Sequence, residues 1–150
     1  MRAYAPNEEV FAASIPPYTP EGKGQMVYNL GEFNAIKFSL CICDFWGTID
    51  YAIMSELLTR VTGVEWTEEE MGTIGRRVLN IGRAFNQREG FNRTHDTVPK
   101  KIVRDALQNG PAAGQVIPPE AFEDMLNQYY EIMGWDENGM MPDELVKSLL

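Results

Sequence analysis

The feature that most constrains the fold is a long helical pattern that begins at Thr67. Thr67 and Glu70 have the spacing of a capping box, in which the hydroxyl accepts a hydrogen bond from a free backbone N–H and the glutamate reaches back to the cap. Apolar residues then recur in alternating steps of three and four, as in an amphipathic helix: Met71, Ile74, Val78, Ile81 and Phe85. The pattern predicts a helix with a single stripe that faces the core.

Three glycines interrupt this helix at Gly72, Gly75 and Gly82. Each costs about 1 kcal/mol of helix stability relative to alanine. Their presence therefore indicates that something bulky lies close to the helix backbone. Close packing against another helix is the simpler explanation, and contact with a large cofactor is the alternative.

The rest of the chain also has helical spacing. Residues 22–38 carry apolar side chains at this spacing, and a second helix, capped by Thr48 or Asp50, is expected to end at Gly63. Further helices are expected from Pro99 to about residue 108, from 118–119 to Gly134, and from Pro142 to the C-terminus. Because no alternating run rich in Val, Ile and Thr occurs, the sequence predicts an all-α fold.

We interpret residues 1–150 as a single, irregular multi-helix domain. Residues 1–22 contain four prolines and are expected to form an extended arm: Pro6, Pro16, Pro17 and Pro20. The segment from Leu40 to Trp46 is apolar except at Asp44, and we expect it to be buried.

The net charge of −9 argues against binding to nucleic acid or to an anionic membrane surface. No stretch of 18 apolar residues is present to span a bilayer, and the N-terminus lacks the apolar core of a signal peptide. The two cysteines, Cys41 and Cys43, are too close in sequence to bridge easily, which excludes a disulfide scaffold. We expect a cytoplasmic protein with reduced thiols.

These two cysteines are the first candidates for chemistry. A thiolate binds iron–sulfur clusters, but a cluster normally takes four such ligands, so any cluster here needs ligands from elsewhere. The alternative is that Cys41 and Cys43 are small buried hydrophobic residues. The single histidine, His95, excludes a site built from several histidines and is interpreted as a solvated turn residue.

Five arginines follow one another between residues 76 and 93, near Glu89 and Asp96: Arg76, Arg77, Arg83, Arg88 and Arg93. Arginine suits bidentate grips on phosphates and carboxylates. We favour a network of ion pairs that fixes the following loop over a grip on a phosphorylated cofactor. Arg83 and Arg88 do not share a helix face, so different partners are expected. Tyr129, Tyr130 and Trp135 are interpreted as core and helix-end packing, because no charged partner is spaced to make them a cage.

Several of these elements together resemble the C-terminal helical domain of the tungsten-containing aldehyde ferredoxin oxidoreductases. The family pattern has a D-x-x-G-L-C element, then R-x-x-N-x-R-E-G-F, an acid-x-x-Pro step and Y-Y-x-x-x-G-W-D. The matching residues here are Leu40-Cys41, Arg83 to Phe91, Asp96 to Pro99 and Tyr129 to Asp136, in the same order over residues 16–150. The family's Asp and Gly before the Leu-Cys pair are replaced by Ile36 and Ser39.

The resemblance implies that Cys41 is the fourth ligand of a [4Fe–4S] cluster and that the backbone around Leu40 lies beside a tungsten–pterin or molybdenum–pterin cofactor. Three further cluster cysteines would come from an earlier, pterin-binding part of the polypeptide. The resemblance implies oxidation of aldehydes to carboxylic acids, with electrons passed to ferredoxin, although a relative such as an aromatic acyl-CoA reductase subunit stays open. Cys43 matches no family ligand, though a shift of one turn could bring it to the cluster.

On this interpretation the chain is part of a longer enzyme, and no catalytic residue is assigned to it. We expect the isolated chain to hold neither a cluster nor a pterin and to be inactive. The rival interpretation is a stand-alone acidic helical module that binds a protein partner without a cofactor.

Overall fold

The computed structural model describes residues 19–43, 45–47, 49–110 and 113–149. The prolines expected in the arm at positions 6, 16 and 17, and Thr48 as a possible cap, lie outside these residues. The described part is helical throughout, without a strand, which confirms the all-α prediction. Its elements are α2 (Lys23–Ser39), α3 (Tyr51–Thr62), α4 (Glu68–Arg88), η1 (Arg93–His95), α5 (Lys100–Arg104), α6 (Pro119–Met133) and α7 (Asp143–Ser148).

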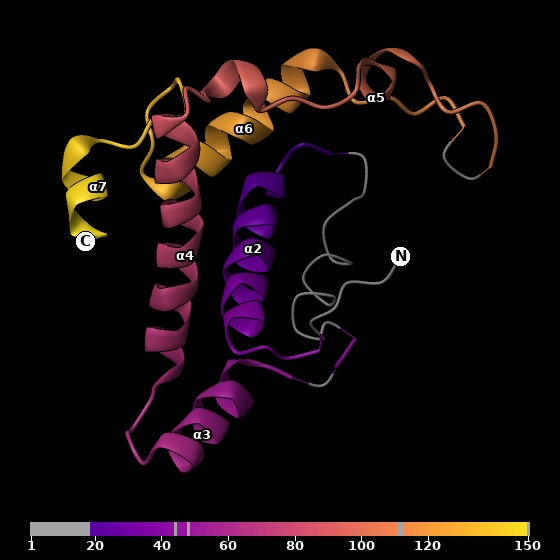
Figure 1. The fold of residues 1–150 in the computed structure, drawn as a ribbon. Coiled ribbons are helices and arrows are strands. Elements are labelled where there is room, and N and C mark those ends of the chain that lie inside the picture. Colours follow the sequence, from indigo (N-terminus) through magenta and orange to yellow (C-terminus); the bar gives the residue numbers. More distant parts are fainter. Residues whose placement is uncertain (1–18, 44, 48, 111–112, 150) are drawn as a thin grey trace.

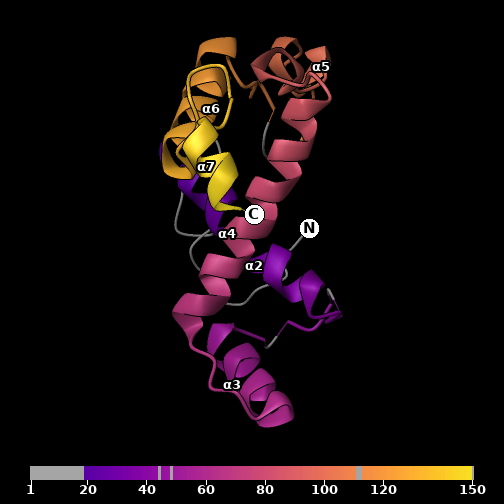
Figure 2. The same cartoon turned by 60° about the vertical axis from the view of Figure 1, so that its left-hand side comes forward.

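The long helix α4 organises the fold (Figure 1). Helix α2 packs along α4 and against α6, while α3 and α7 contact α4 at different places. The turned view places α3 at the lower end of α4 and α6 and α7 around its upper half (Figure 2). None of the described helices combines the length and the apolarity needed to cross a bilayer.

Most of the predicted helix ends are confirmed. Thr67 and Glu70 form the reciprocal capping box at the start of α4. Asp50 caps α3 by accepting a hydrogen bond from the backbone N–H of Ile53, and Gly63 ends that helix in the left-handed conformation. The helix expected from Pro99 to about residue 108 is shorter than predicted: α5 ends at Arg104.

The apolar core lies where α2, α3 and the start of α4 meet. It contains Phe33 and Ile36 from α2, Ile49 and Met54 from the α3 region, and Met71 from α4. At the opposite end of α4, a second buried group includes Tyr130 and Met133 of α6, Met141, and the polar residues Asn80 and Arg83.

The predicted core-facing stripe of α4 is only partly correct. Met71 is buried and Ile74 packs against the core, but Val78, Ile81 and Phe85 are 37%, 49% and 54% exposed. The physical reason is that α3 covers only the first part of this face (Figure 1). Towards its C-terminal end, α4 instead buries the face that carries Asn80 and Arg83.

The glycine interpretation is confirmed at two of the three positions. A side chain at Gly75 would overlap the backbone carbonyl of Glu32 on α2, and one at Gly72 would meet the Glu32 carboxylate. Close packing of α2 therefore accounts for both. At Gly82, no described atom beyond the flanking residues and the surrounding backbone of α4 lies within 4 Å of where a Cβ would be.

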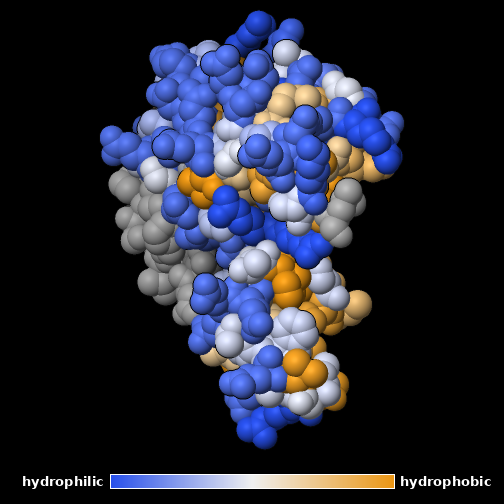
Figure 3. Space-filling model, turned by 90° about the vertical axis from the view of Figure 1, so that its left-hand side faces the viewer, coloured by the Kyte–Doolittle hydropathy of each residue, from blue (hydrophilic) through white to orange (hydrophobic). Residues whose placement is uncertain are grey.

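The prediction that residues 40–46 are buried is wrong. Leu40 and Ile42 pack against the core, but Cys41, Cys43 and Trp46 are exposed and Phe45 is 82% exposed. The segment turns back after α2, so that only its alternate residues point inwards. Hydrophobic atoms also reach the surface between polar ones at the lower end of the molecule, where α3 lies (Figure 3).

Candidate functional site

Helix α2 ends in a tight turn that places Cys41 in the left-handed backbone conformation. The N–H of Ile42 donates to the carbonyl of Lys37 (3.1 Å), and the N–H of Cys41 donates to the carbonyl of Phe38 (3.0 Å). This is the Schellman pattern, in which two hydrogen bonds satisfy carbonyls that the helix end leaves free. Cys41 has φ 56°, the only positive value among the described residues other than glycine. We call Leu40–Cys43 the cysteine turn.

Two other helices of the same molecule end with this hydrogen-bond pattern but use glycine. At the end of α4, Gly90 (φ 89°) donates to Gln87 while Phe91 donates to Asn86. At the end of α6, Gly134 (φ 76°) occupies the same place. Glycine adopts this conformation without strain, whereas another residue pays about 1–2 kcal/mol. Cys41 therefore stands where local stability favours glycine, and such outliers gather at functional sites.

The thiols of the cysteine turn are accessible. Both Cys41 and Cys43 are free and exposed, so the alternative that they are small buried hydrophobic residues is wrong. Three large apolar side chains near them in sequence are also exposed: Phe38, Phe45 and Trp46. Large exposed apolar side chains of this kind form a surface that another protein segment can cover.

The described residues do not form a complete metal site. No group of three or more His, Cys, Asp or Glu side chains within them is arranged to hold a metal ion. Cys41 fits a cluster as one thiolate ligand presented from a fixed turn, and the remaining ligands must come from elsewhere.

The residues before the cysteine turn include the two at which the chain departs from the family pattern. Leu40 packs against the core, which holds its backbone in place. Ile36, which stands where the resembling family has Asp, is 2% exposed and lies in the core. Ser39 donates its hydroxyl to the carbonyl of Ala35 (2.7 Å). Ile36 therefore cannot make the hydrogen bond to a cofactor that an aspartate at this position would make, whereas the Ser39 hydroxyl is exposed.

The arginine-rich segment forms a separate polar cluster at the far end of α4. Arg83, only 7% exposed, pairs with both carboxylate oxygens of Asp96 (2.9 and 2.6 Å) and donates from Nε to the carbonyl of Gly139 (2.7 Å). The Tyr130 hydroxyl donates to the same carboxylate (2.5 Å). We call Arg83, Asp96, Tyr130 and Gly139 the arginine clamp.

The charges of the arginine clamp stabilise one another. Partial burial alone would raise the pKa of Asp96, but the hydrogen bonds from Arg83 and Tyr130 outweigh it and lower that pKa below its ordinary value. Burial and the hydrogen bond to Asp96 raise the pKa of Tyr130 to about 12, so its hydroxyl stays protonated and donates. The clamp is therefore a stable ion pair at neutral pH.

The Gly134-Trp135-Asp136 element completes this end of the molecule. Trp135 donates from its ring nitrogen to Asn80 (2.9 Å), and the Asp136 carboxylate accepts from two backbone N–H groups of the next turn, at Asn138 and Met140 (both 2.8 Å). Arg83 lies 4.7 Å from the centre of the Trp135 ring. The expectation that no charged partner serves these aromatic side chains is therefore wrong.

The other predicted residues of this region are placed as expected. Arg88 pairs with Glu89 rather than with Asp96, which confirms that Arg83 and Arg88 serve different partners. Arg93 pairs with Glu123 and donates to the carbonyl of Glu137. These arginines thus form the structural network that the sequence favoured. His95 is exposed in the short helix η1, where its Nδ1 accepts from the N–H of Asn92.

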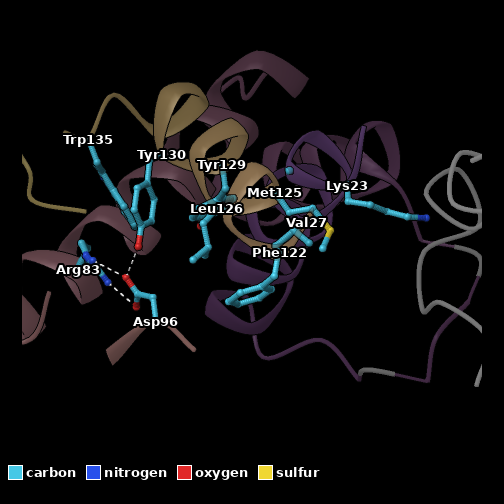
Figure 4. A pocket seen from close by; sticks show the side chains of 11 residues that line it. Lys23, Val27, Arg83, Asp96, Phe122, Met125, Leu126, Tyr129, Tyr130 and Trp135 are labelled. Atoms are coloured by element: carbon cyan, nitrogen blue, oxygen red, sulfur yellow. Dashed lines mark hydrogen bonds and ion pairs between the residues drawn. The ribbon is translucent and has the colours of Figure 1, made fainter. Parts of the chain in front are cut away.

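Beside the arginine clamp lies a pocket of about 360 Å³ that the sequence did not predict (Figure 4). Arg83, Asp96 and Tyr130 lie at one end, and apolar side chains of α2 and α6 line the rest: Val27, Phe122, Met125, Leu126 and Tyr129. The pocket involves the first turns of α2, whereas the cysteine turn follows its last residue (Figure 1). It is therefore not part of the candidate cluster site.

The fold and the site define an all-α domain with an exposed cysteine on a strained helix end and without a full set of metal ligands in the described residues. Residues 1–150 match the family described as aldehyde ferredoxin oxidoreductase, domains 2 & 3. The chain belongs to the aldehyde ferredoxin oxidoreductase family.

The similar proteins agree with this assignment. The chain is 30% identical to the tungsten-containing aldehyde ferredoxin oxidoreductase of Pyrococcus abyssi over 132 residues, which are 85% of the chain and 21% of that protein. The Pyrococcus furiosus protein of the same name is also 30% identical over 139 residues, 89% of the chain and 22% of that protein. An aliphatic sulfonate oxidoreductase, WOR-like subunit, of P. furiosus is 26% identical over 74% of the chain and 19% of its own length. The chain thus spans about a fifth of the length of these relatives.

Proposed function

We propose that this chain is the C-terminal part of an aldehyde ferredoxin oxidoreductase-like enzyme, in which Cys41 is one ligand of a [4Fe–4S] cluster. The single observation that carries the proposal is the exposed cysteine at a left-handed helix end, where α4 and α6 have glycine. Backbone outliers of this kind gather at functional sites, and a thiolate is the usual protein ligand of such clusters.

The chain supplies position and burial rather than acid–base chemistry. The Schellman hydrogen bonds and the packing of Leu40 hold the Cys41 backbone, so the position from which its side chain extends is set before a cluster binds. The backbone around Leu40 forms one wall of the cofactor and substrate cavity. In the intact enzyme, the tungsten–pterin or molybdenum–pterin centre supplies aldehyde oxidation and the cluster supplies electron transfer to ferredoxin.

The exposed apolar side chains around the cysteine turn support the view that another part of the enzyme covers it. Phe38, Phe45 and Trp46 would shield a cluster from water once the pterin-binding part of the same polypeptide lies over them. Shielding and the hydrogen bonds around the sulfur set the reduction potential of such a centre. We also propose that the protein is cytoplasmic.

Anaerobic reconstitution with iron and sulfide, followed by reduction with dithionite, tests what each of the two parts contributes to the cluster. The 150-residue chain is expected to bind no stoichiometric cluster by electron paramagnetic resonance, because it offers too few thiolates. The full-length enzyme treated in the same way should show the reduced cluster signal. A stoichiometric cubane signal from the chain alone would overturn the proposal.

The second candidate is a stand-alone acidic helical module that binds a protein partner without a cofactor. The net charge and the exposed apolar side chains fit it as well. The Cys41→Ser variant of the full-length protein separates the two candidates. Loss of cluster iron supports the enzyme, and unchanged iron supports the interaction module.

A further inference from the structure

One face of α4 is exposed although it has the pattern of a packing surface. Val78, Ile81 and Phe85 are spaced as i, i+3 and i+7, and Gly82 fills the i+4 position. The three side chains are more than a third exposed, and apart from Ile81, Arg83 and the surrounding backbone of α4, no described atom comes within 4 Å of a Cβ placed at Gly82. We call Val78, Ile81, Gly82 and Phe85 the α4 apolar face. It continues the stripe whose first residues, Met71 and Ile74, are covered by the core next to α3.

The glycine shows what kind of partner fits this face. Elsewhere in the molecule, helix glycines lie where another helix approaches closely: Gly75 faces the backbone of α2, and Gly24 faces the backbone of α6 at Tyr129. A glycine in a helix interior weakens that helix unless close packing compensates for it. Gly82 has no such contact among the described residues. A helix that crosses at Gly82 and packs between Ile81 and Phe85 would give it one.

We infer that the α4 apolar face is buried in the intact enzyme by a helix of the same polypeptide that lies outside residues 1–150. The relatives are about five times as long as the segment they share with this chain, so most of such a polypeptide is available to supply the helix. The i, i+3, i+4, i+7 spacing is that of helix-to-helix recognition. The inference rests on the proposed function only in that the chain is one part of a longer enzyme.

Thiol labelling of the full-length enzyme tests the inference. Ile81→Cys and Phe85→Cys are compared with Glu69→Cys, which lies in the exposed acidic first turn of the same helix. Anaerobic holoenzyme is treated with a maleimide, and the modified α4 peptide is quantified by mass spectrometry. Burial predicts labelling at positions 81 and 85 at least about ten-fold slower than at position 69, because it requires local opening. Equal rates would overturn the inference.

Dilution identifies the occupant of the face. Protection by a helix of the same polypeptide is independent of enzyme concentration, whereas protection by a second copy is lost when the oligomer dissociates. Protection that disappears on dilution would therefore overturn the inference in favour of a second copy. The readout does not involve the cluster, so failure of this inference and failure of Cys41 ligation are distinguishable.

The change in unfolding temperature caused by Gly82→Ala is a second test, because an open face and a covered face predict opposite signs. Alanine favours the helix, so the variant raises the unfolding temperature if the face is open to solvent. Close approach of another backbone reverses the sign, and we expect a lower unfolding temperature for the full-length enzyme. Thr73→Ala, at an exposed position of α4, is the matched control and should leave the unfolding temperature unchanged or slightly raised. A higher unfolding temperature for Gly82→Ala than for the wild type would contradict the inference.

Discussion

The strained conformation of Cys41 predicts that glycine at this position stabilises the fold while alanine does not. A residue other than glycine at φ 56° pays about 1–2 kcal/mol. Glycine removes that cost, but it also makes the unfolded chain more flexible, which lowers the free energy of unfolding by about 0.4–1 kcal/mol. We therefore expect Cys41→Gly to be more stable than Cys41→Ala by about 0.5–1 kcal/mol. For a domain of this size the difference corresponds to about 1–4 °C in Tm.

Urea unfolding of the 150-residue chain, followed by far-ultraviolet circular dichroism, measures the difference. Both variants remove the thiol, so the comparison isolates the backbone cost. Gly90→Ala is the matched control, because Gly90 (φ 89°) occupies the equivalent place at the end of α4, and it should destabilise by about 1 kcal/mol. If Cys41→Ala is as stable as Cys41→Gly, the turn is not strained and the conformation of Cys41 does not mark its thiol as functional.

Three further predictions concern the arginine clamp and the packing of α2 on α4. Arg83→Leu should destabilise the chain by about 2 kcal/mol in urea unfolding, because Asp96 loses two charge-assisted hydrogen bonds; an unchanged midpoint would show that the pair is not stabilising. The folded pKa of Asp96 lies below its ordinary value of 3.8, so its contribution is complete above that value and is lost as the pH falls through the folded pKa. Asp96→Asn should therefore lose less stability than the wild type between about pH 6 and about pH 3, and parallel losses would contradict the shift. Gly75→Ala should destabilise the chain and Gly72→Ala much less in thermal unfolding, because position 75 meets a backbone carbonyl of Glu32 whereas position 72 meets only its side chain; equal effects would contradict the close approach.

Local sequence patterns predicted most of the secondary structure. The capping box of Thr67, the cap at Asp50 and the helix end at Gly63 depend only on residues within one or two turns, so the sequence predicts them well. The period of the apolar residues predicted the helices α2, α4 and α6 for the same reason. The family motifs indicated the aldehyde ferredoxin oxidoreductase family over residues 16–150, and the family match over residues 1–150 confirms it.

Tertiary contacts could not be predicted in the same way. The stripe of α4 is a real apolar face, but its period does not reveal that α3 covers only its first residues and leaves Val78 and Ile81 exposed. The exposed cysteine turn was missed because an apolar run is ordinarily buried, and the left-handed Cys41 has no local sequence signal other than the end of the helix.

The arginine clamp joins residues far apart in sequence. Asp96 accepts from Arg83, 13 residues before it, and from Tyr130, 34 residues after it. The spacing of Arg83 and Asp96 suggested an ion-pair network, but the contribution of Tyr130 and the carbonyl of Gly139 depends on how α6 and the following turn fold back onto α4. The way in which these distant segments fold together cannot be predicted from the spacing of residues in one sequence.

Iron and acid-labile sulfide analysis of the full-length Cys41→Ser enzyme, purified anaerobically, tests the central claim most directly. Cys43→Ser is the matched control, because its thiol is exposed on the same turn but matches no ligand of the family. The account predicts that Cys41→Ser loses most of its cluster iron and sulfide and its cluster signal in electron paramagnetic resonance, while Cys43→Ser retains both. Wild-type iron and sulfide in Cys41→Ser, or an equal loss in the two variants, would contradict the assignment of Cys41 as the cluster ligand.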